Sequence, residues 1–255
     1  MIILIFILVG LTALAFTPTY ESANVKVFEN PSDPTNSLLY FLAIIVFTAI
    51  VMILTRKSEF FLKLVMYSLL FISAFYIFYP FFGILSIIPS SIVIVALLKR
   101  PNTLTINISA FLLACGITAM FGISLEPIPV LVLLIILAVY DFVAVYTTKH
   151  MIDLAESVVK LKLPLLFIIP TDDKPTMLGV GDVVIPNILT VSAQTFLNSP
   201  KIFGLKIPAL TTLIGGALGL TILLIFAEKF KRAHAGLPFI NSGAILGFLI
   251  GCMIS

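Results

Sequence analysis

The stretch Leu131-Val-Leu-Leu-Ile-Ile-Leu-Ala-Val-Tyr-Asp-Phe-Val-Ala-Val145 is apolar enough to cross a membrane, yet it carries a carboxylate at Asp141. A second apolar stretch, Leu178-Gly-Val-Gly-Asp-Val-Val-Ile185, carries another at Asp182. A carboxylate at the centre of a bilayer costs about 2.5–3.5 kcal/mol of insertion free energy, so the pair costs about 5–7 kcal/mol. Because intramembrane ionisable residues mark functional sites, a chain that carries both is expected to use both.

The composition places the whole chain in a membrane. Of its 255 residues, 60% are hydrophobic and 11% are charged, whereas soluble domains contain about 25% charged residues. The net charge of +3 is small and dispersed, which argues against a nucleic-acid partner. Cys115 and Cys252 lie in apolar runs and are interpreted as core residues, and His150 and His234 as solvated loop residues. No metal-ligand spacing or phosphate-binding motif is present, so neither a metal nor an organic cofactor is expected.

The apolar runs predict an all-α polytopic membrane protein, with nine transmembrane helices in a single domain. The predicted spans are residues 2–16, 37–55, 60–79, 82–98, 104–122, 126–147, 177–196, 207–227 and 237–254. The first run could instead be a signal peptide. However, no Lys or Arg precedes it and no clear small-residue cleavage site follows it, so a retained span is expected.

The basic residues orient the bundle. Twelve of the 15 Lys and Arg residues fall in or at the edge of the loops after the second, fourth, sixth and eighth spans, and only Lys26, Lys201 and Lys206 fall in the others. Cytoplasmic loops carry the excess of Lys and Arg, so the N-terminus is predicted to be cytoplasmic and the C-terminus extracellular, in the cell membrane. Asp141 and Asp182 then lie at similar depth on neighbouring helices, in the cytoplasmic half of the bilayer.

The sequence Gly179-Val-Gly-Asp182 has a physical logic at the start of a span. Glycine lacks a Cβ, so Gly179 and Gly181 let another backbone approach the acid and loosen the helix start. Pro186 further weakens the backbone hydrogen bonds of this span. Two carboxyls brought together in an apolar site are what an aspartyl protease needs.

These motifs resemble those of the presenilin and signal peptide peptidase family of intramembrane aspartyl proteases. The family has Tyr-Asp in span 6, Gly-x-Gly-Asp in span 7 and Pro-Ala-Leu at the start of span 9. Tyr140-Asp141 and Gly179 to Asp182 match the first two, and the number and order of the predicted spans match as well. The predicted orientation is that of presenilin, and the compact chain is most similar to prokaryotic, archaeal homologues. The resemblance implies Asp141 and Asp182 as the catalytic pair, supported by Tyr140, Gly179 and Gly181.

The third motif departs from the family pattern. A literal Pro208-Ala209-Leu210 opens the eighth predicted span on the outer side, which is the wrong helix and the wrong face for the dyad. It is interpreted as an ordinary helix start, where proline is common. The positional equivalent lies at the cytoplasmic start of the ninth span, so the resemblance implies the supporting role for Leu237, Pro238 and Phe239.

The resemblance implies an intramembrane endopeptidase that cleaves single-span membrane proteins or peptides within the bilayer. One Asp would act as general base toward a water, and the other, protonated, would polarise the scissile carbonyl and protonate the leaving nitrogen. The cytoplasmic loop 148–176 holds an apolar stretch from Lys160 to Pro170. In the family this region can pair as a strand with an extended substrate; the alternative is an interfacial segment that only covers the dyad. The sequence does not set the oligomeric state.

Two other classes of protein use carboxylates in a similar setting. Prepilin peptidases also use a Gly-x-Gly-Asp aspartate, but they usually carry a Lys two residues after it, where this chain has Val184. A secondary transporter or cation channel could use the same carboxylates for proton or ion coupling. No clear inverted repeat relates the two halves of the chain, which weakens the transporter hypothesis.

Overall fold

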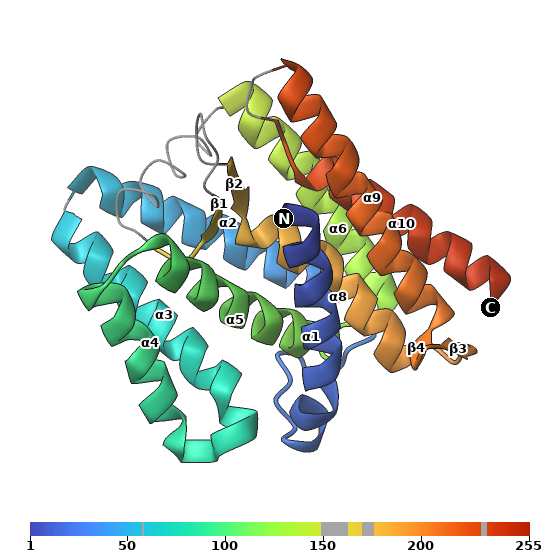
Figure 1. Cartoon of the computed structure of the whole chain (residues 1–255), viewed down its shortest axis with the longest axis horizontal. Coiled ribbons are helices and arrows are strands. Elements are labelled where there is room, and N and C mark those ends of the chain that lie inside the picture. The colour runs from blue at the N-terminus through green and yellow to red at the C-terminus, as the bar shows by residue number, and fades with distance from the viewer. Residues whose placement is uncertain (58, 149–162, 170–175, 231–233) are drawn as a thin grey trace.

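The computed structural model describes residues 1–57, 59–148, 163–169, 176–230 and 234–255 as a mostly helical bundle (Figure 1). The helices are α1 (Ile2–Ser22), α2 (Thr35–Lys57), α3 (Glu59–Phe82), η1 (Gly83–Ser86), α4 (Ile87–Lys99), α5 (Thr103–Gly122), α6 (Pro127–Val143), η2 (Ala144–Thr148), α8 (Val180–Phe196), α9 (Ile207–Phe230) and α10 (Leu237–Ile254). Two short antiparallel hairpins pair β1 (Leu166–Ile169) with β2 (Thr176–Gly179), and β3 (Lys201–Ile202) with β4 (Leu205–Lys206).

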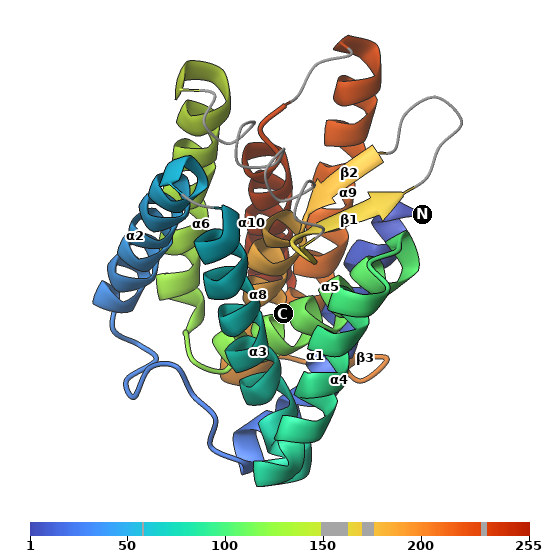
Figure 2. The same ribbon diagram turned by 90° about the vertical axis from the view of Figure 1, so that its left-hand side faces the viewer.

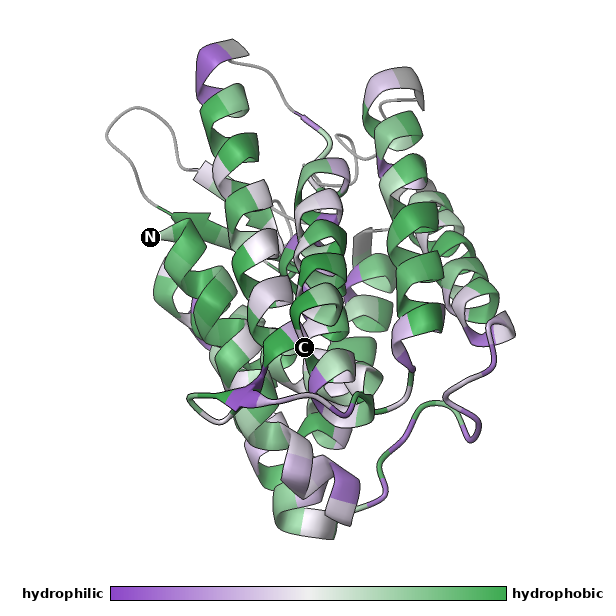
Figure 3. Ribbon diagram, turned by 90° about the vertical axis from the view of Figure 1, so that its right-hand side faces the viewer, coloured by the Kyte–Doolittle hydropathy of each residue, from purple (hydrophilic) through white to green (hydrophobic). Residues whose placement is uncertain are grey.

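The helices have the length and surface of membrane spans. Within the described residues, seven helical segments are long and apolar enough to cross a membrane. One of them, Phe60–Lys99, contains both α3 and α4, and the chain reverses between them at Gly83, whose φ of 56° suits glycine (Figure 2). The helices consist mostly of hydrophobic residues, and hydrophilic residues gather toward the helix ends and loops (Figure 3). Many large hydrophobic side chains of these helices are exposed. These features indicate a multi-pass membrane protein.

Helix α8 lies at the centre of the bundle. It packs against α1, α5, α6, α9 and α10, and all residues from Val183 to Ala193 are buried. By contrast, α2 lies at the periphery, where Leu38, Leu39 and Leu42 are each more than half exposed. A helix that is apolar on all sides can be buried in this way only when other helices surround it. The central helix is also the one that begins at the Gly-x-Gly-Asp motif.

The first helix is longer than the sequence indicates. It continues past Pro18 to Ser22, whereas the apolar run predicted a span that ends at residue 16. Tyr20 explains the extension, because its ring is fully buried and its hydroxyl donates a hydrogen bond to the carbonyl of Ile77, at 2.7 Å. Tertiary packing therefore overrides the local tendency of a Thr-Pro-Thr segment to end a helix.

The region between the two aspartate helices contains strands that the all-α prediction did not include. β2 occupies residues 176–179, so α8 begins at Val180 rather than at residue 177, where the span was predicted to begin. β1 lies within the predicted loop 148–176, and Lys160 and Lys162 of that loop lie outside the described residues. Figure 2 shows the β1–β2 hairpin toward one end of the bundle and β3 toward the other.

Candidate active site

Asp141 lies in the last turn of α6 and faces the start of α10. Its side chain is only 6% exposed, and its Oδ2 accepts a hydrogen bond from the backbone N–H of Leu237, at 3.0 Å. The first amides of a helix lack partners within the helix and carry positive partial charge. The start of α10 therefore provides a donor that suits a carboxylate.

Asp182 lies in the first turn of α8 and is half-buried. Glycines give its carboxyl group room on two sides, because a Cβ on Gly179 or on Gly236 would lie 3.0 Å from Asp182 Oδ2. Pro186 has no N–H to bond the carbonyl of Asp182, four residues earlier, so the first turn of α8 is weakly held. Local sequence thus leaves the backbone open around this acid.

The two carboxyls meet at the start of α10. Leu237 donates to Asp141, while Gly236, the preceding residue, lies against the Asp182 carboxyl. Residues separated by 41 positions on two helices are thereby brought to one point by a third helix.

Tyr140 and the motif glycines occupy different surroundings. The ring of Tyr140 packs edge-on against Phe41 of α2, with ring centroids 5.7 Å apart. Gly179 is in close contact with the Asp182 carboxyl, whereas a Cβ on Gly181 would approach only Ile185, at 3.8 Å. Gly179 is therefore required by packing around the acid, and Gly181 leaves open space beside it.

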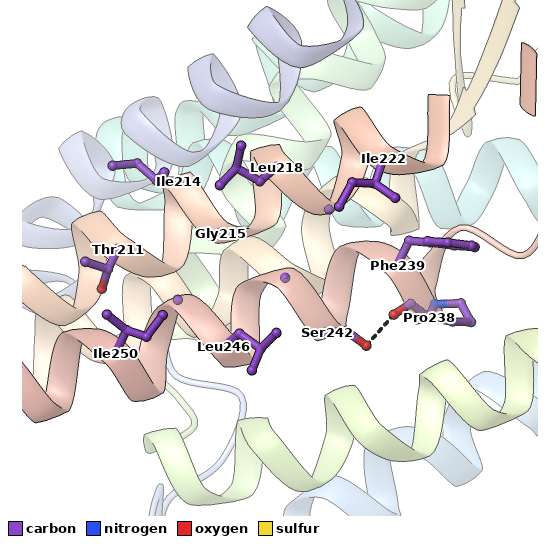
Figure 4. A pocket seen from close by; sticks show the side chains of 13 residues that line it. Thr211, Ile214, Gly215, Leu218, Ile222, Pro238, Phe239, Ser242, Leu246 and Ile250 are labelled. Carbon is purple, nitrogen blue, oxygen red and sulfur yellow. Dashed lines mark hydrogen bonds between the residues drawn. The ribbon is translucent and has the colours of Figure 1, made fainter. Parts of the chain in front are cut away.

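Of the three residues predicted at the start of the last span, Leu237 donates its backbone N–H to Asp141. Pro238 and Phe239 line an apolar groove of about 680 Å³ between α9 and α10 (Figure 4). Phe239 packs against Phe226 of α9, with ring centroids 5.5 Å apart. The carbonyl of Pro238 accepts a hydrogen bond from Ser242, at 2.6 Å. These two residues therefore shape the contact of α10 with α9.

The literal Pro208-Ala209-Leu210 motif lies far from the aspartates. It is at the start of α9, and Pro208 packs against Gly251, near the end of α10. Gly236 and Gly251 are 15 residues apart, which corresponds to about 22 Å along a helix. The placement agrees with the interpretation of this motif as an ordinary helix start.

Three contributors to this region were missed in the sequence. Gly236 precedes the predicted Leu237 and lies directly against the Asp182 carboxyl. A Gly-Leu-Pro sequence at a helix start is a signal that could have identified it. His234 was interpreted as a solvated loop residue, but its Nδ1 lies 2.8 Å from the hydroxyl of Tyr146. His150 lies outside the described residues. Asn107 of α5 holds strand β1, and nothing in its local sequence indicates this.

The register of the β1–β2 hairpin determines which backbone groups are free. Both the N–H and the C=O of Ile168 bond to Asn107, so the Ile168–Met177 pair has its main-chain groups turned away from each other. The N–H of Val180 bonds to the carbonyl of Leu165, which fits the same alternation. The N–H and C=O of Met177 and Gly179 therefore point to the edge of β2 away from β1, three to five residues before Asp182.

The sequence as a whole matches the family model described as signal-peptide peptidase, presenilin aspartyl protease, over residues 3–255. The chain belongs to this family. It is similar to a presenilin-family intramembrane aspartate protease solved in two crystal forms. In the C222 form the identity is 32% and the TM-score 0.74, and in the P2 form 33% and 0.76. In both, the match covers 99% of this chain and 96% of the other.

This presenilin-family chain is thus an aspartic endopeptidase of the intramembrane type. The family consists of proteases that act on membrane proteins in a bilayer. Within the described residues, no three His, Cys, Asp or Glu side chains come together as a metal-ligand set.

Proposed function

We propose that Asp141 and Asp182 are the catalytic dyad of this protease and that it hydrolyses peptide bonds in transmembrane segments of single-span membrane proteins. The observation that supports this most directly is the meeting of both carboxyls at Gly236 and Leu237. Two neighbouring carboxyls in an apolar site do not both ionise readily, so they are expected to share one proton and titrate as a pair. The bundle is proposed to have nine spans, with α3, α4 and α8 each crossing the membrane.

The surroundings of the two acids support a different role for each in this mechanism. Asp141 accepts a hydrogen bond from the first turn of α10, which favours a carboxylate anion there. Asp141 is therefore the proposed general base toward water. Asp182 is the proposed acid, which donates a hydrogen bond to the scissile carbonyl and then delivers a proton to the leaving nitrogen.

The edge of β2 provides a place for the substrate backbone. A transmembrane helix must unwind before its peptide bond is accessible, and the unwound segment then needs partners for its N–H and C=O groups. The outward groups of Met177 can supply them by strand addition. Because β2 runs directly into Gly179 and Asp182, a peptide paired with it is led to the dyad.

The test is cleavage of a single-span reporter by the purified protein in liposomes. Asp141→Asn and Asp182→Asn should each lower the cleavage rate by about 10²- to 10⁴-fold, the usual contribution of a general acid or base. Thermal stability should stay equal or rise, because each change removes one of two ionisable carboxyl groups whose burial together in an apolar site is unfavourable. The pH–rate profile of the unaltered protein should be bell-shaped, since the dyad needs one proton and only one.

Asp33→Asn is the matched control. Asp33 is an exposed carboxylate whose Oδ1 accepts the N–H of Thr35, at 2.9 Å, and an asparagine can keep that hydrogen bond. This variant should cleave like the unaltered protein. Substantial cleavage by either dyad variant would contradict the shared-proton mechanism. Ion-driven uptake without reporter cleavage would instead support a transporter.

A further inference from the structure

Asn107 makes an unusual contact with the hairpin beside the dyad. It lies in the second turn of α5, and its carboxamide bonds twice to the same residue of β1. Its Nδ2 donates to the carbonyl of Ile168 at 2.7 Å, and its Oδ1 accepts the N–H of Ile168 at 2.8 Å. A carboxamide has the same donor and acceptor as a peptide group, so this side chain occupies the place that a neighbouring strand would take.

The contact makes the two edges of the hairpin unequal. Helix α5 packs along β1, as Figure 2 shows, and Asn107 occupies both outward groups of Ile168. On the other edge, the N–H and C=O of Met177 meet no hydrogen-bonding partner within the described part of the chain. Unpaired groups on a strand edge are a template for another chain. An extended peptide is thereby directed to β2 and away from β1.

We propose that Asn107 is a positioning residue for the substrate. It closes the β1 edge and fixes the hairpin against α5, so that a peptide joins β2 in the one register that brings its scissile bond to Asp141 and Asp182. This inference rests on the proposed function above, because it presupposes strand addition at β2. Asn107 acts through β1 and β2, and its role concerns where the substrate is cut as well as how fast.

A change at Asn107 therefore has a signature beyond lost activity. Without the carboxamide, Ile168 has an unpaired N–H and C=O, and the hairpin is free to shift along α5. A substrate strand that slips by two residues along β2 keeps the same side chains on the same face. Because the repeat is about 3.3 Å per residue, such a slip moves the peptide by about 6.6 Å and shifts the cut by two residues.

The experiment compares Asn107→Ala, Asn107→Asp and Asn102→Ala in liposomes. Asn107→Asp has the size of the original side chain and keeps the bond from the Ile168 N–H, but it loses the donor to the Ile168 carbonyl. Asn102→Ala is the control, because Asn102 caps the same helix by accepting the N–H of Thr105 and makes no hydrogen bond to the hairpin within the described part of the chain. The readouts are kcat, KM, the masses of the cleavage products and the thermal unfolding temperature.

Both Asn107 variants should lower kcat by about 10- to 100-fold, since small displacements at a catalytic centre have effects of this size. Both should also yield new products, cut two residues from the original position. Asn102→Ala should keep the original cut, even where its unfolding temperature falls as far as that of Asn107→Ala. If Asn107→Ala does not fold, the cleavage position in the isosteric variant Asn107→Asp tests the inference by itself.

An unchanged kcat and a single, original cleavage position in Asn107→Asp would overturn the inference. Loss of rate with the original cut, matched by Asn102→Ala at equal stability, would also overturn it and leave Asn107 a structural residue only. The unaltered protein and Asp182→Asn separate this outcome from failure of the proposed function. If the unaltered protein does not cleave, or if Asp182→Asn does, the dyad proposal fails first.

Discussion

Gly236 is the residue at which α10 comes closest to Asp182, and it allows a sharp test of the geometry. Its φ of −80° and ψ of −47° suit any residue, so Gly236→Ala introduces no backbone strain. The new Cβ would lie 3.0 Å from Oδ2 and 3.1 Å from Cγ of Asp182, so the carboxyl must move by a few tenths of an ångström. We expect kcat to fall by about tenfold or more with little loss of thermal stability.

Gly181→Ala is the informative comparison for that variant. Its Cβ would approach only Ile185, at 3.8 Å, and would leave the carboxyl in place while filling space beside it. Loss of activity in Gly181→Ala should therefore appear mainly as a higher KM, whereas in Gly236→Ala it should appear as a lower kcat. Equal kcat values in Gly236→Ala and the unaltered protein would contradict the close approach of α10 to Asp182.

At the scale of single residues, the sequence identifies a site where a reactive side chain is also costly to place in a membrane. Asp141 and Asp182 stand out because each is a carboxylate in an apolar run. Gly236 and Asn107 do not stand out, because their roles depend on side chains that reach them from other helices. A residue that acts through tertiary contact leaves no periodic or spacing signal in its own segment.

The β1–β2 hairpin is the element that the sequence could not predict in detail. Leu-Phe-Ile-Ile at residues 166–169 is a continuous apolar run, which periodicity cannot assign to helix or strand. Residues 177–179 were included in a helical span because they adjoin a long apolar run, yet in the structure they belong to β2, and Gly179 disfavours a helix there. Long, uniform runs such as α5 and α10 left no such ambiguity.

Met177→Pro tests whether the edge of β2 receives the substrate. The N–H of Met177 points away from β1, so proline removes a group that the hairpin itself does not use. We expect unchanged expression and thermal stability, but KM for the reporter raised by about fivefold or more, as one hydrogen bond of about 1 kcal/mol is lost. Leu178→Pro removes an N–H that faces β1 and should destabilise the hairpin itself. Unchanged KM in Met177→Pro would exclude strand addition at this residue.

At the scale of the whole molecule, the two ends of the bundle carry different hairpins, and the loops predicted on the two sides differ in their number of basic residues. The β1–β2 hairpin and the start of α10 lie toward one end of the bundle, while the β3–β4 hairpin, with Lys201 and Lys206, lies toward the other (Figure 2). By sequence, most of the remaining Lys and Arg residues fall in or next to the four loops that are predicted to be cytoplasmic. The sequence therefore predicts on which side of the membrane each loop lies. It does not predict how the helices pack around α8, because that packing depends on which helix faces meet.

The charge asymmetry gives a topological prediction. By sequence, twelve of the 15 basic residues fall in or next to the four loops predicted to lie on the dyad side, so that side should be cytoplasmic. A phosphatase that is active only outside the cell should be active when fused after Ser255 and inactive when fused after Phe230, because only α10 separates the two positions. A fluorescent protein that matures only in the cytoplasm should show the opposite pattern at each fusion point. Both reporters on one side at both positions would mean that α10 does not span the membrane. A reversed pattern at both positions would place the dyad in the outer half of the bilayer, against the positive-inside rule.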